Sequence, residues 1–534
     1  MRFTIIDCYT DEPSGLGVLP TLGTYPRYLA GAVLESGNEF YYLTIDDIRA
    51  TVLEYEGKKT VLQIKEKEKE IKTNVKIRNL TPNFGDITKI LDSSDVIIII
   101  AGVHTPGKYL SAYPGTTKEI STLLKKLRCK TFKVLTGPAA HTGSGLWGGK
   151  KARSVDQDVD QFDLVVKDLE YKFDELIKNN FTEDINFDII NNNLNKKENQ
   201  NYKTYDKISR KAVLGASIVE HLPLNPKFVT VEIETMRGCA RKVPCSFCTE
   251  KLKSNCVERR PAKDIIEEIK ALSKVGLNNF RIGKQTCIYS YGDEKKLEQL
   301  FKEISKYANI LHIDNVNPTF VNEEKTKTLV KYCTSGNVAA MGVESFDKKV
   351  IKSNMLNTSP ELTFKKIKLI NQYGAERGSC GMPKFIPGIN LIFGLINESK
   401  NSHKENLFWL NKIIDEGLLL RRINVREVVI FPETQLDKEA GDKFLKKNRK
   451  HYWKWRNDIR QNIDHVMLKK IVPEGTILKN LRTEIYDGNT TFARQVGTYP
   501  LVVGIKGRIQ LDEFVNVKIV GHMLRSLVGE IVSK

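Results

Sequence analysis

Short apolar runs alternate with helical patterns in two long stretches of this chain, and this alternation constrains the fold most. In the first stretch, residues 1–150, strands are predicted at 2–7, 39–44, 96–101 and 132–136, and helices at 25–36 and 117–127. Apolar strands joined by helical crossovers form parallel sheets that helices cover on both faces. We therefore expect an α/β fold that begins with a doubly wound, Rossmann-like domain.

Three unusual loops follow strand ends in this first domain. They are residues 7–17, 102–109 (GVHTPGKY) and 137–149 (GPAAHTGSGLWGG). In a doubly wound sheet, ligands bind beyond the carboxyl ends of the strands, and glycine lets the backbone approach a ligand closely. These loops therefore predict a ligand site.

The second alternating stretch covers residues 216–435. Strands are predicted at 228–234 and near 279–282, 311–314, 339–343, 390–393 and 423–430. Units of about 30 to 50 residues fit a full or partial (β/α) barrel. The intervening residues 151–215 are predicted to hold an amphipathic helix at 163–178 and then an Asn- and Lys-rich linker at 179–205.

The last hundred residues change character. Residues 436–474 form a helical segment in which bases alternate with aromatics, and residues 475–534 show short strands and turns that predict a small β-barrel. Bases can neutralise phosphates and aromatic faces can stack on unpaired bases. The predicted RNA-binding residues are Lys446, Lys447, Arg449, Lys450, Tyr452, Trp453, Lys454, Trp455 and Arg456. The alternative is an amphipathic helix whose aromatics pack on the barrel.

Composition points to a cytoplasmic protein with an acidic partner. The formal net charge is +19, and cations that neutralise phosphates favour nucleic acid; a lysine-rich proteome would give the same charge. No run of about 18 apolar residues predicts a membrane span, and the first residues lack a signal-peptide pattern. The nine cysteines are too few and too uneven for a disulfide scaffold.

Three of those cysteines lie together in ETMRGCARKVPCSFCTE, directly after a predicted strand. Cys239, Cys245 and Cys248 have C-x5-C-x2-C spacing. Three thiolates can hold three irons of a [4Fe-4S] cluster, which leaves the fourth iron open to chelate S-adenosylmethionine (SAM). A zinc site with Cys256 as a fourth ligand is the alternative. Cys287, Cys333 and Cys380 are unassigned.

At these residues the chain resembles the radical SAM superfamily, although the usual spacing there is C-x3-C-x2-C. The resemblance implies that Phe247 lies beside the adenine of SAM. AAMGVESFD resembles the strand that reaches the ribose or methionine moiety through Glu344 and Ser345, and INLIFGLINES resembles the turn near the adenine, which assigns Gly394. The usual Gly-Gly-Glu is replaced by RIGKQ, in which Gly283 and Gln285 are candidates.

The flanking regions also resemble parts of radical SAM enzymes. The first domain resembles a cobalamin-binding domain, although its D-x-H-x-x-G motif is absent, since Gly102 precedes His104 and Gly107 where Asp belongs. The last 60 residues resemble the RNA-binding TRAM barrel. The whole order, with motifs HTPGKYL, FRIGKQ, LHIDNVNP and LLLRRINVRE, resembles an archaeal radical SAM family. A reductant such as ferredoxin or flavodoxin is implied.

These features favour an enzyme that methylates an unreactive carbon of a tRNA or rRNA nucleoside. Methylthiolation would need three cysteines ahead of the cluster motif, and only Cys8 and Cys129 precede it. One alternative is radical SAM modification of a protein side chain or a small metabolite. Another is a non-catalytic, zinc-stabilised RNA-binding protein.

Overall fold

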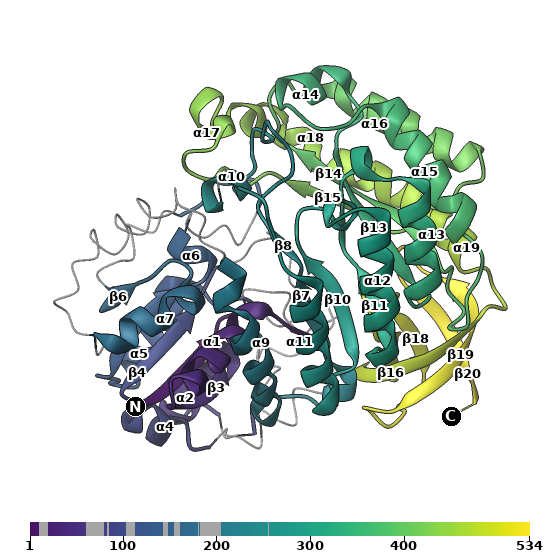
Figure 1. Cartoon of the computed structure of the whole chain (residues 1–534). Helices are drawn as coiled ribbons and strands as arrows, with labels where there is room; N and C mark the ends of the chain where they lie inside the picture. Colours follow the sequence, from purple (N-terminus) through teal and green to yellow (C-terminus); the bar gives the residue numbers. More distant parts are fainter. Residues whose placement is uncertain are drawn as a thin grey trace.

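The computed structural model describes residues 1–9, 20–59, 63, 80–82, 85–102, 113–141, 148–153, 161–179, 181, 204–254 and 256–533. Its elements form an N-terminal α/β domain, a central partial barrel and a small C-terminal β-barrel (Figure 1). The predicted fold class is confirmed. No helix in these ranges is long and apolar enough to cross a membrane.

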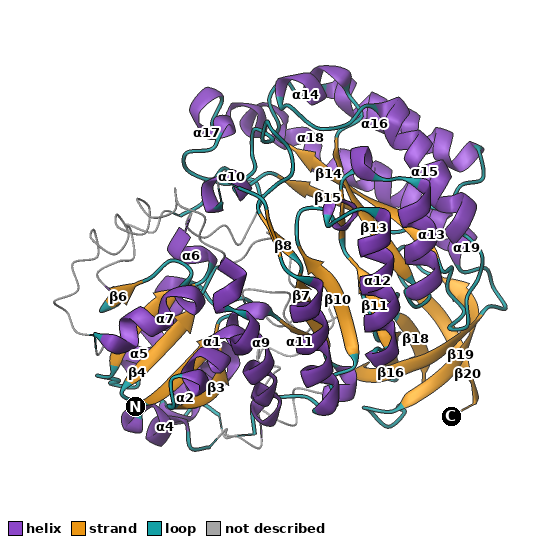
Figure 2. Ribbon diagram, viewed as in Figure 1, coloured by secondary structure: helices purple, strands orange, loops and turns teal. Residues whose placement is uncertain are grey.

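The N-terminal domain is a parallel sheet between two layers of helices (Figure 2). The strand order is β3-β1-β4-β5-β6, so the order reverses between β1 and β4, where doubly wound folds bind ligands. Its strands are β1 (Arg2–Asp7), β3 (Glu39–Thr44), β4 (Val96–Ile100), β5 (Phe132–Thr136) and β6 (Leu164–Val165). Its helices are α1 (Thr24–Glu35), α2 (Ile45–Tyr55), α4 (Ile87–Ser93), α5 (Thr117–Lys126), α6 (Pro138–His141) and α7 (Leu169–Lys178).

The prediction for residues 163–178 was wrong at its start. Leu164 and Val165 form β6, which pairs in parallel with β5, and helix α7 begins only after Asp168, whose φ of 51° is left-handed. The free edge of β5 offers main-chain hydrogen bonds to the short apolar run, and this outweighs its helical pattern. The first domain therefore extends beyond residue 150. Most of the predicted linker 179–205 lies outside the described residues.

The central domain is a partial (β/α) barrel made of two parallel sheets, β11-β10-β7-β2 and β12-β13-β14-β15. Its strands are β7 (Thr230–Glu234), β10 (Asn279–Lys284), β11 (Ile310–Ile313), β12 (Asn315–Val316), β13 (Asn337–Glu344), β14 (Phe385–Phe393) and β15 (Ile423–Glu427). Its larger helices are α11 (Ala262–Lys274), α12 (Glu294–Ile304), α13 (Glu323–Tyr332), α14 (Lys348–Ser353), α15 (Pro360–Gly374) and α16 (Lys400–Asp415). The predicted strands are confirmed; β10, β13 and β14 are longer than expected, whereas β7 and β15 are shorter.

A two-residue strand joins the first two domains. Strand β2 (Thr21–Leu22) pairs in parallel with β7, and the amide of Thr230 donates to the carbonyl of Pro20 at 2.9 Å. Helix α9 (Ser209–Leu214) then packs on α1, where Gly31 and Gly215 leave room for close backbone approach. The segment between β1 and α1 of the first domain thus adds one short strand to the barrel sheet.

The chain ends with three helices and a closed barrel. The helices are α17 (Gln435–Glu439), α18 (Lys443–Ile459) and α19 (His465–Ile471). The barrel order is β16-β17-β18-β20-β19, with β16 (Ile477–Asp487), β17 (Thr490–Gln495), β18 (Val503–Lys506), β19 (Phe514–His522) and β20 (Leu527–Ser533). Both the helical segment and the small β-barrel are as predicted.

Candidate active site

The three clustered cysteines lie in one loop at the carboxyl end of β7. Strands β8 (Met236–Arg237) and β9 (Glu258–Arg259) pair antiparallel and close the base of this loop, which also holds the short helix α10 (Glu250–Lys253). Gly238 has a φ of 74°, and a side chain there would collide with the carbonyl of Cys256. Cys239, Cys245 and Cys248 are half-buried free thiols.

Arg241 and Glu344 lie next to Cys245. The Arg241 Nη1 is 2.6 Å from the Cys245 Sγ. Burial raises the pKa of Cys245 to about 11, and the positive charge of Arg241 opposes this shift. Cys239 and Glu344 are close enough to raise that pKa further. The loop therefore brings two of its thiols and the end of β13 together.

The donor set fits a [4Fe-4S] cluster. A [4Fe-4S] cluster that binds SAM needs three thiolates, one on each of three irons, and the loop supplies three half-buried thiols. Cys256, the fourth ligand of the zinc alternative, is exposed, whereas the three loop cysteines are half-buried.

Glu344 is the predicted SAM residue that the structure supports best. It ends β13 at a register shift, with a left-handed φ of 65°. Within the described residues its Oε2 is buried and has no hydrogen-bond partner. Burial raises the pKa of Glu344 to about 8, and Arg426 opposes this. A bound ligand at the barrel mouth could supply the hydrogen-bond donor that the carboxyl oxygen of this strained residue lacks.

The other predicted SAM residues have roles within the protein. Phe247 packs on the apolar cluster that contains Leu395 and Val428. The Ser345 hydroxyl accepts the amide of Asp347 at 3.1 Å. Gly394, with a φ of 95°, donates its amide to Glu398 at 2.7 Å and gives space to Leu445.

Gly283 and Gln285 also make hydrogen bonds within the protein. The Gly283 carbonyl accepts from the side chain of Asn315 at 3.2 Å. Both ends of the Gln285 amide are used, by Thr235 at 3.3 Å and by the carbonyl of Ile282 at 2.8 Å. Contacts of these two residues and of Phe247, Ser345 and Gly394 with SAM stay predictions.

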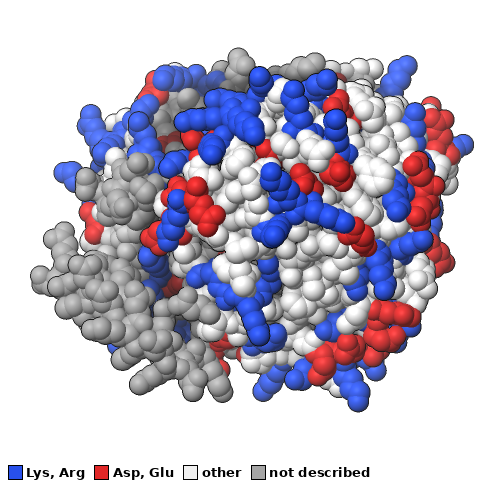
Figure 3. Space-filling model, turned by 90° about the horizontal axis from the view of Figure 1, so that it is seen from above, with Lys and Arg blue, Asp and Glu red and all other residues white. Residues whose placement is uncertain are grey.

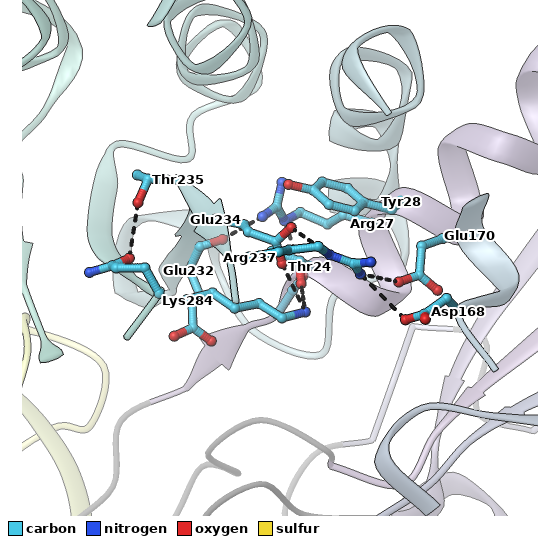
Figure 4. A network of polar contacts seen from close by, with 12 residues as sticks. Thr24, Arg27, Tyr28, Asp168, Glu170, Glu232, Glu234, Thr235, Arg237 and Lys284 are labelled. Atoms are coloured by element: carbon cyan, nitrogen blue, oxygen red, sulfur yellow. Dashed lines mark hydrogen bonds and ion pairs between the residues drawn. The ribbon is translucent and has the colours of Figure 1, made fainter. Parts of the chain in front are cut away.

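A charged network joins the N-terminal domain to the base of the cysteine loop (Figure 4). Arg237, two residues before Cys239, is 3.4 Å from Asp168 and 3.3 Å from Glu170. It is also 3.3 Å from Glu234 and lies over the Tyr171 ring at 3.9 Å. A residue of the barrel thus binds two carboxylates of the first domain.

A second, fully buried group links the same domains. Glu268 on α11 pairs with Arg27 of α1 and with Arg260, and all three side chains are 0% exposed. Burial alone would raise the pKa of Glu268, but Arg260 and Arg27 hold it below the ordinary value. The carboxylate therefore stays charged between two guanidinium groups.

The loop after β5 reaches the mouth of the barrel. The amide of Gly149 donates to the carbonyl of Val428 at 2.9 Å, and that of Ala152 to Ile430 at 2.8 Å. One glycine-rich loop therefore ends beside the carboxyl end of β15, and the ligand site predicted there stays a prediction. Residues 142–147 of this loop, and His104 and Gly107 of the loop after β4, lie outside the described residues.

The opposite end of the barrel is closed by the loop that joins β17 and β18. The Thr498 amide donates to Nδ1 of His312 at 2.9 Å, and the Tyr499 hydroxyl donates to Asp314. The Arg422 guanidinium lies over the Tyr499 ring at 3.5 Å. Arg281 pairs with Asp314 from the other side. The C-terminal barrel thus supplies a floor for the central one.

The basic and aromatic segment is an amphipathic helix, which corrects part of the RNA prediction. Tyr452 and Trp455 are 9% and 5% exposed and pack on Phe393. They cannot stack on bases, because residues three and four apart share the buried face of a helix. Trp453 is 61% exposed. Lys446, Lys447, Arg449, Lys450 and Lys454 are exposed and Arg456 is half-buried, so these residues stay candidates.

The remaining cysteines have ordinary packing roles. Cys287 is buried, and its sulfur accepts the amide of Asn317 at 3.1 Å. Cys333 and Cys380 pack against the main apolar core. Sequence reasoning missed Arg237, Arg426 and Tyr499. The alternation of polar residues in INVRE (423–427) could have indicated Arg426. Arg237 and Tyr499 could not be found in this way, because their roles depend on contacts between domains.

Comparison with known proteins agrees with this geometry. Residues 233–392 match the model of the Radical SAM superfamily. The chain is 40% identical to "Uncharacterized protein MJ0274" of Methanocaldococcus jannaschii, covering 99% of this chain and 93% of that protein. It is 35% identical to an uncharacterized protein of Archaeoglobus fulgidus, covering 99% and 90%.

Two solved structures are also similar. TsrM from Kitasatospora setae, a radical S-adenosylmethionine methyltransferase, has 11% identity and a TM-score of 0.48, covering 82% of this chain and 75% of that one. OxsB, a cobalamin-dependent S-adenosylmethionine radical enzyme, has 14% identity and a TM-score of 0.47, covering 84% and 56%. The chain belongs to the same family as MJ0274, and its residues 233–392 form a domain of the Radical SAM superfamily. Proteins of this superfamily use a [4Fe-4S] cluster and SAM, and here Cys239, Cys245 and Cys248 are the residues that can hold the cluster.

Proposed function

We propose that this chain methylates an unreactive carbon of a tRNA or rRNA nucleoside, with a corrinoid bound between its N-terminal domain and the barrel mouth. Cys239, Cys245 and Cys248 would hold a [4Fe-4S] cluster, which when reduced would supply one electron for cleavage of SAM and hence removal of a hydrogen atom from the carbon. A corrinoid would supply the methyl group, taken from a second SAM that leaves as S-adenosylhomocysteine. A donor such as ferredoxin or flavodoxin would supply two electrons in total, one for each cofactor.

The observation that carries the corrinoid is the position of the first domain. Its switch point lies at strand ends, β2 extends the barrel sheet, and Gly149 binds Val428 beside β15. A flat ligand on the strand ends would therefore face the cysteine loop. The fold similarity of the cobalamin-dependent OxsB is consistent with this proposal.

The observation that supports RNA is the charge of the surface near the mouth. Figure 3 looks onto the end of the molecule where α14, α16, α17 and α18 lie, and Lys and Arg form larger patches there than Asp and Glu. Helix α18 approaches the mouth, because Leu445 packs on Gly394 at the end of β14. Its exposed bases could hold phosphates while one nucleoside enters the barrel.

Mass spectrometry of RNA nucleosides from a deletion strain beside its parent tests the reaction. We expect one nucleoside from the deletion strain to be about 14 mass units lighter than in the parent, which is the mass difference between C–CH₃ and C–H. A strain that expresses the C239A, C245A and C248A triple variant should show the same defect. Unchanged nucleosides would favour a protein side chain or a metabolite as substrate.

Equilibrium dialysis with hydroxocobalamin tests the corrinoid separately. The full chain should retain about one equivalent. No retention would remove methylation through cobalamin while leaving SAM cleavage in place.

A further inference from the structure

The barrel encloses a lumen that is partly open, as the alternation of burial along its strands shows. On β13, β14 and β15 the residues that face the outer helices are buried, whereas the alternate residues at the upper ends are half-exposed. Those half-exposed residues are Gly342, Glu344, Asn390, Ile392, Asn424 and Arg426. Because strand residues alternate between faces, five of them point into the barrel. Glu344 follows a register shift, and its carboxyl lies on the same face because its Oε1 is 3.1 Å from where a Gly342 Cβ would be.

Contacts of Tyr499 form a floor below this wall of the barrel. Tyr499 contacts Asp314 and Arg422, and Arg281 pairs with Asp314. Burial would raise the pKa of Asp314, but Arg281 and Arg422 lower it, so this floor is a compensated ion pair. A ligand that enters from the mouth, where the cysteine loop lies, would meet the half-exposed residues above this floor.

Three polar side chains form a surface above this floor, defined here as the lumen ledge: Asn390, Asn424 and Arg426. Asn390 and Asn424 are partners in the β14–β15 register, and their amides are 3.1 Å apart. With its oxygen turned toward Arg426, Asn424 accepts from the Nε of that residue at 2.8 Å. The Arg426 guanidinium is thereby held in a fixed orientation.

The ledge lies next to Glu344. Gly342 and Asn390 are register partners, and a side chain at Gly342 would meet the Glu344 Oε1 at 3.1 Å. The Glu344 carboxyl thus lies over the lumen face, close to Arg426. The ledge and Glu344 together offer donors and acceptors within one wall of the cavity.

We propose that the lumen ledge recognises the acceptor nucleoside and that Arg426 binds a base edge with two adjacent acceptors, as the O6 and N7 of guanine provide. The inference rests on the proposed function. A guanidinium donates two parallel hydrogen bonds to such an edge. The amides of Asn390 and Asn424 can then satisfy the remaining polar atoms. Arg426 is a binding residue, and the ledge takes no part in SAM cleavage.

Chemical footprinting of the reconstituted full chain tests this assignment. Phenylglyoxal should label Arg426, detected by peptide mass spectrometry. Unfractionated tRNA from the deletion strain should protect it, and SAM alone should not. Arg210 of helix α9, with 76% of its side chain exposed, serves as the label control. An Arg426 that never reacts, or that SAM protects, would overturn the proposal and place Arg426 in a closed core or in the SAM site.

Two variants separate the ledge from the rest of the site. R426Q should lower the modified nucleoside in a complemented deletion strain at least tenfold, much more than it lowers uncoupled 5′-deoxyadenosine formation. R426K should lose most of that modification too, because one ammonium cannot replace a bidentate donor. R210Q is the matched control.

The outcomes distinguish the ledge from the proposed function. If a nucleoside is missing in the deletion strain but R426Q restores it fully, the ledge assignment is wrong and the function stands. If no nucleoside is missing, the chain does not modify RNA, and the proposal that Arg426 binds a nucleoside base is wrong as well. A tenfold loss of SAM affinity in R426Q assigns Arg426 to SAM and rejects the ledge.

Discussion

The two flanking domains contact different parts of the radical SAM barrel through different chemistry. The N-terminal domain meets the mouth through ion pairs, with Arg237 bound to Asp168 and Glu170 and with Glu268 held between Arg27 and Arg260. The C-terminal barrel forms the floor by donating hydrogen bonds to neutral His312 and to Asp314 of the central barrel, and by placing the ring of Tyr499 under Arg422.

This difference indicates what each domain contributes. The mouth interface includes Arg237, two residues from Cys239, so the position of the first domain is coupled to the cysteine loop. The floor interface ends in the lumen, so the C-terminal barrel is part of the cavity as well as a candidate RNA-binding module. Removing residues 475–534 would therefore damage the barrel core and would not test RNA binding alone.

The largest effect is expected at the mouth interface, from E268A. Removal of one partner from a buried ion group leaves the other charges unpaired, at a cost of about 3 to 5 kcal/mol. The midpoint of urea unfolding should fall strongly. E267A is the control, because Glu267 is exposed, with 49% of its side chain accessible. Equal midpoints for the two variants would show that the buried group does not hold the domains together.

Removing the contacts of Tyr499 at the floor should lower the free energy of unfolding less than E268A does. Y499A removes a ring and a hydrogen bond to a charged group, at about 2 to 4 kcal/mol. Y499F removes only the hydroxyl, at roughly 1.5 to 3 kcal/mol. Hydrogen exchange of β10 and β11 amides should report the loss locally.

Tyr486 provides the control for the hydroxyl. It donates to the carbonyl of Ile509 at 2.8 Å within the same small barrel. Y486F should cost about 1 kcal/mol, since its acceptor is neutral, and should leave β10 and β11 protected. Similar exchange in Y499F and Y486F would contradict the account of the floor.

Mild acid should weaken the floor through His312. Burial lowers the pKa of His312 to about 4. Its stabilising contribution is complete above the unfolded value near 6.5 and is lost as the pH falls from there toward 4. Between pH 7 and 5 the loss should be about 2 kcal/mol. The mouth differs in having carboxylates with shifts in both directions: the pKa is lowered at Asp168 and Glu268, whereas burial and the charge of Asp168 raise it at Glu170.

H312N checks the sign of this effect. The variant should be less stable at neutral pH, but exchange of the floor amides should no longer accelerate between pH 7 and 5. An unchanged pH dependence in H312N would assign the effect to another group.

Reversing the charges of α18 should have the smallest effect on the barrel. K446E, K447E, R449E and K450E lie on an exposed face, so uncoupled SAM cleavage should be nearly unchanged. RNA affinity should fall, and the slope of its logarithm against the logarithm of salt should flatten as fewer phosphates are bound. Unchanged affinity would move preference to a protein substrate.

Periodicity predicted most of the fold. Apolar runs identified the strands of both sheets, and the cysteine spacing identified the loop at the end of β7. Strands β2 and β6 were missed because two residues give no period, and only a free sheet edge makes them extended. The burial of Tyr452 and Trp455 could have been predicted, since they share a helical face with Asn448 and Ile459.

The site was less predictable than the fold. Arg27 and Glu268 are 241 residues apart in the chain, and Tyr499 and Asp314 are 185 apart. No local pattern pairs such residues. Gly394 and Gln285 make hydrogen bonds of a kind found at many turns and strand ends. That the Glu344 Oε2 lacks a hydrogen-bond partner among the described residues depends on the three-dimensional positions of its neighbours, which the sequence does not give.

The most direct measurement is SAM cleavage by anaerobically reconstituted and reduced protein. The account predicts one [4Fe-4S] cluster and formation of 5′-deoxyadenosine, both abolished by C239A, C245A or C248A, with C256A as a control that keeps them. Formation of 5′-deoxyadenosine by the triple C239A, C245A and C248A variant would contradict the central claim.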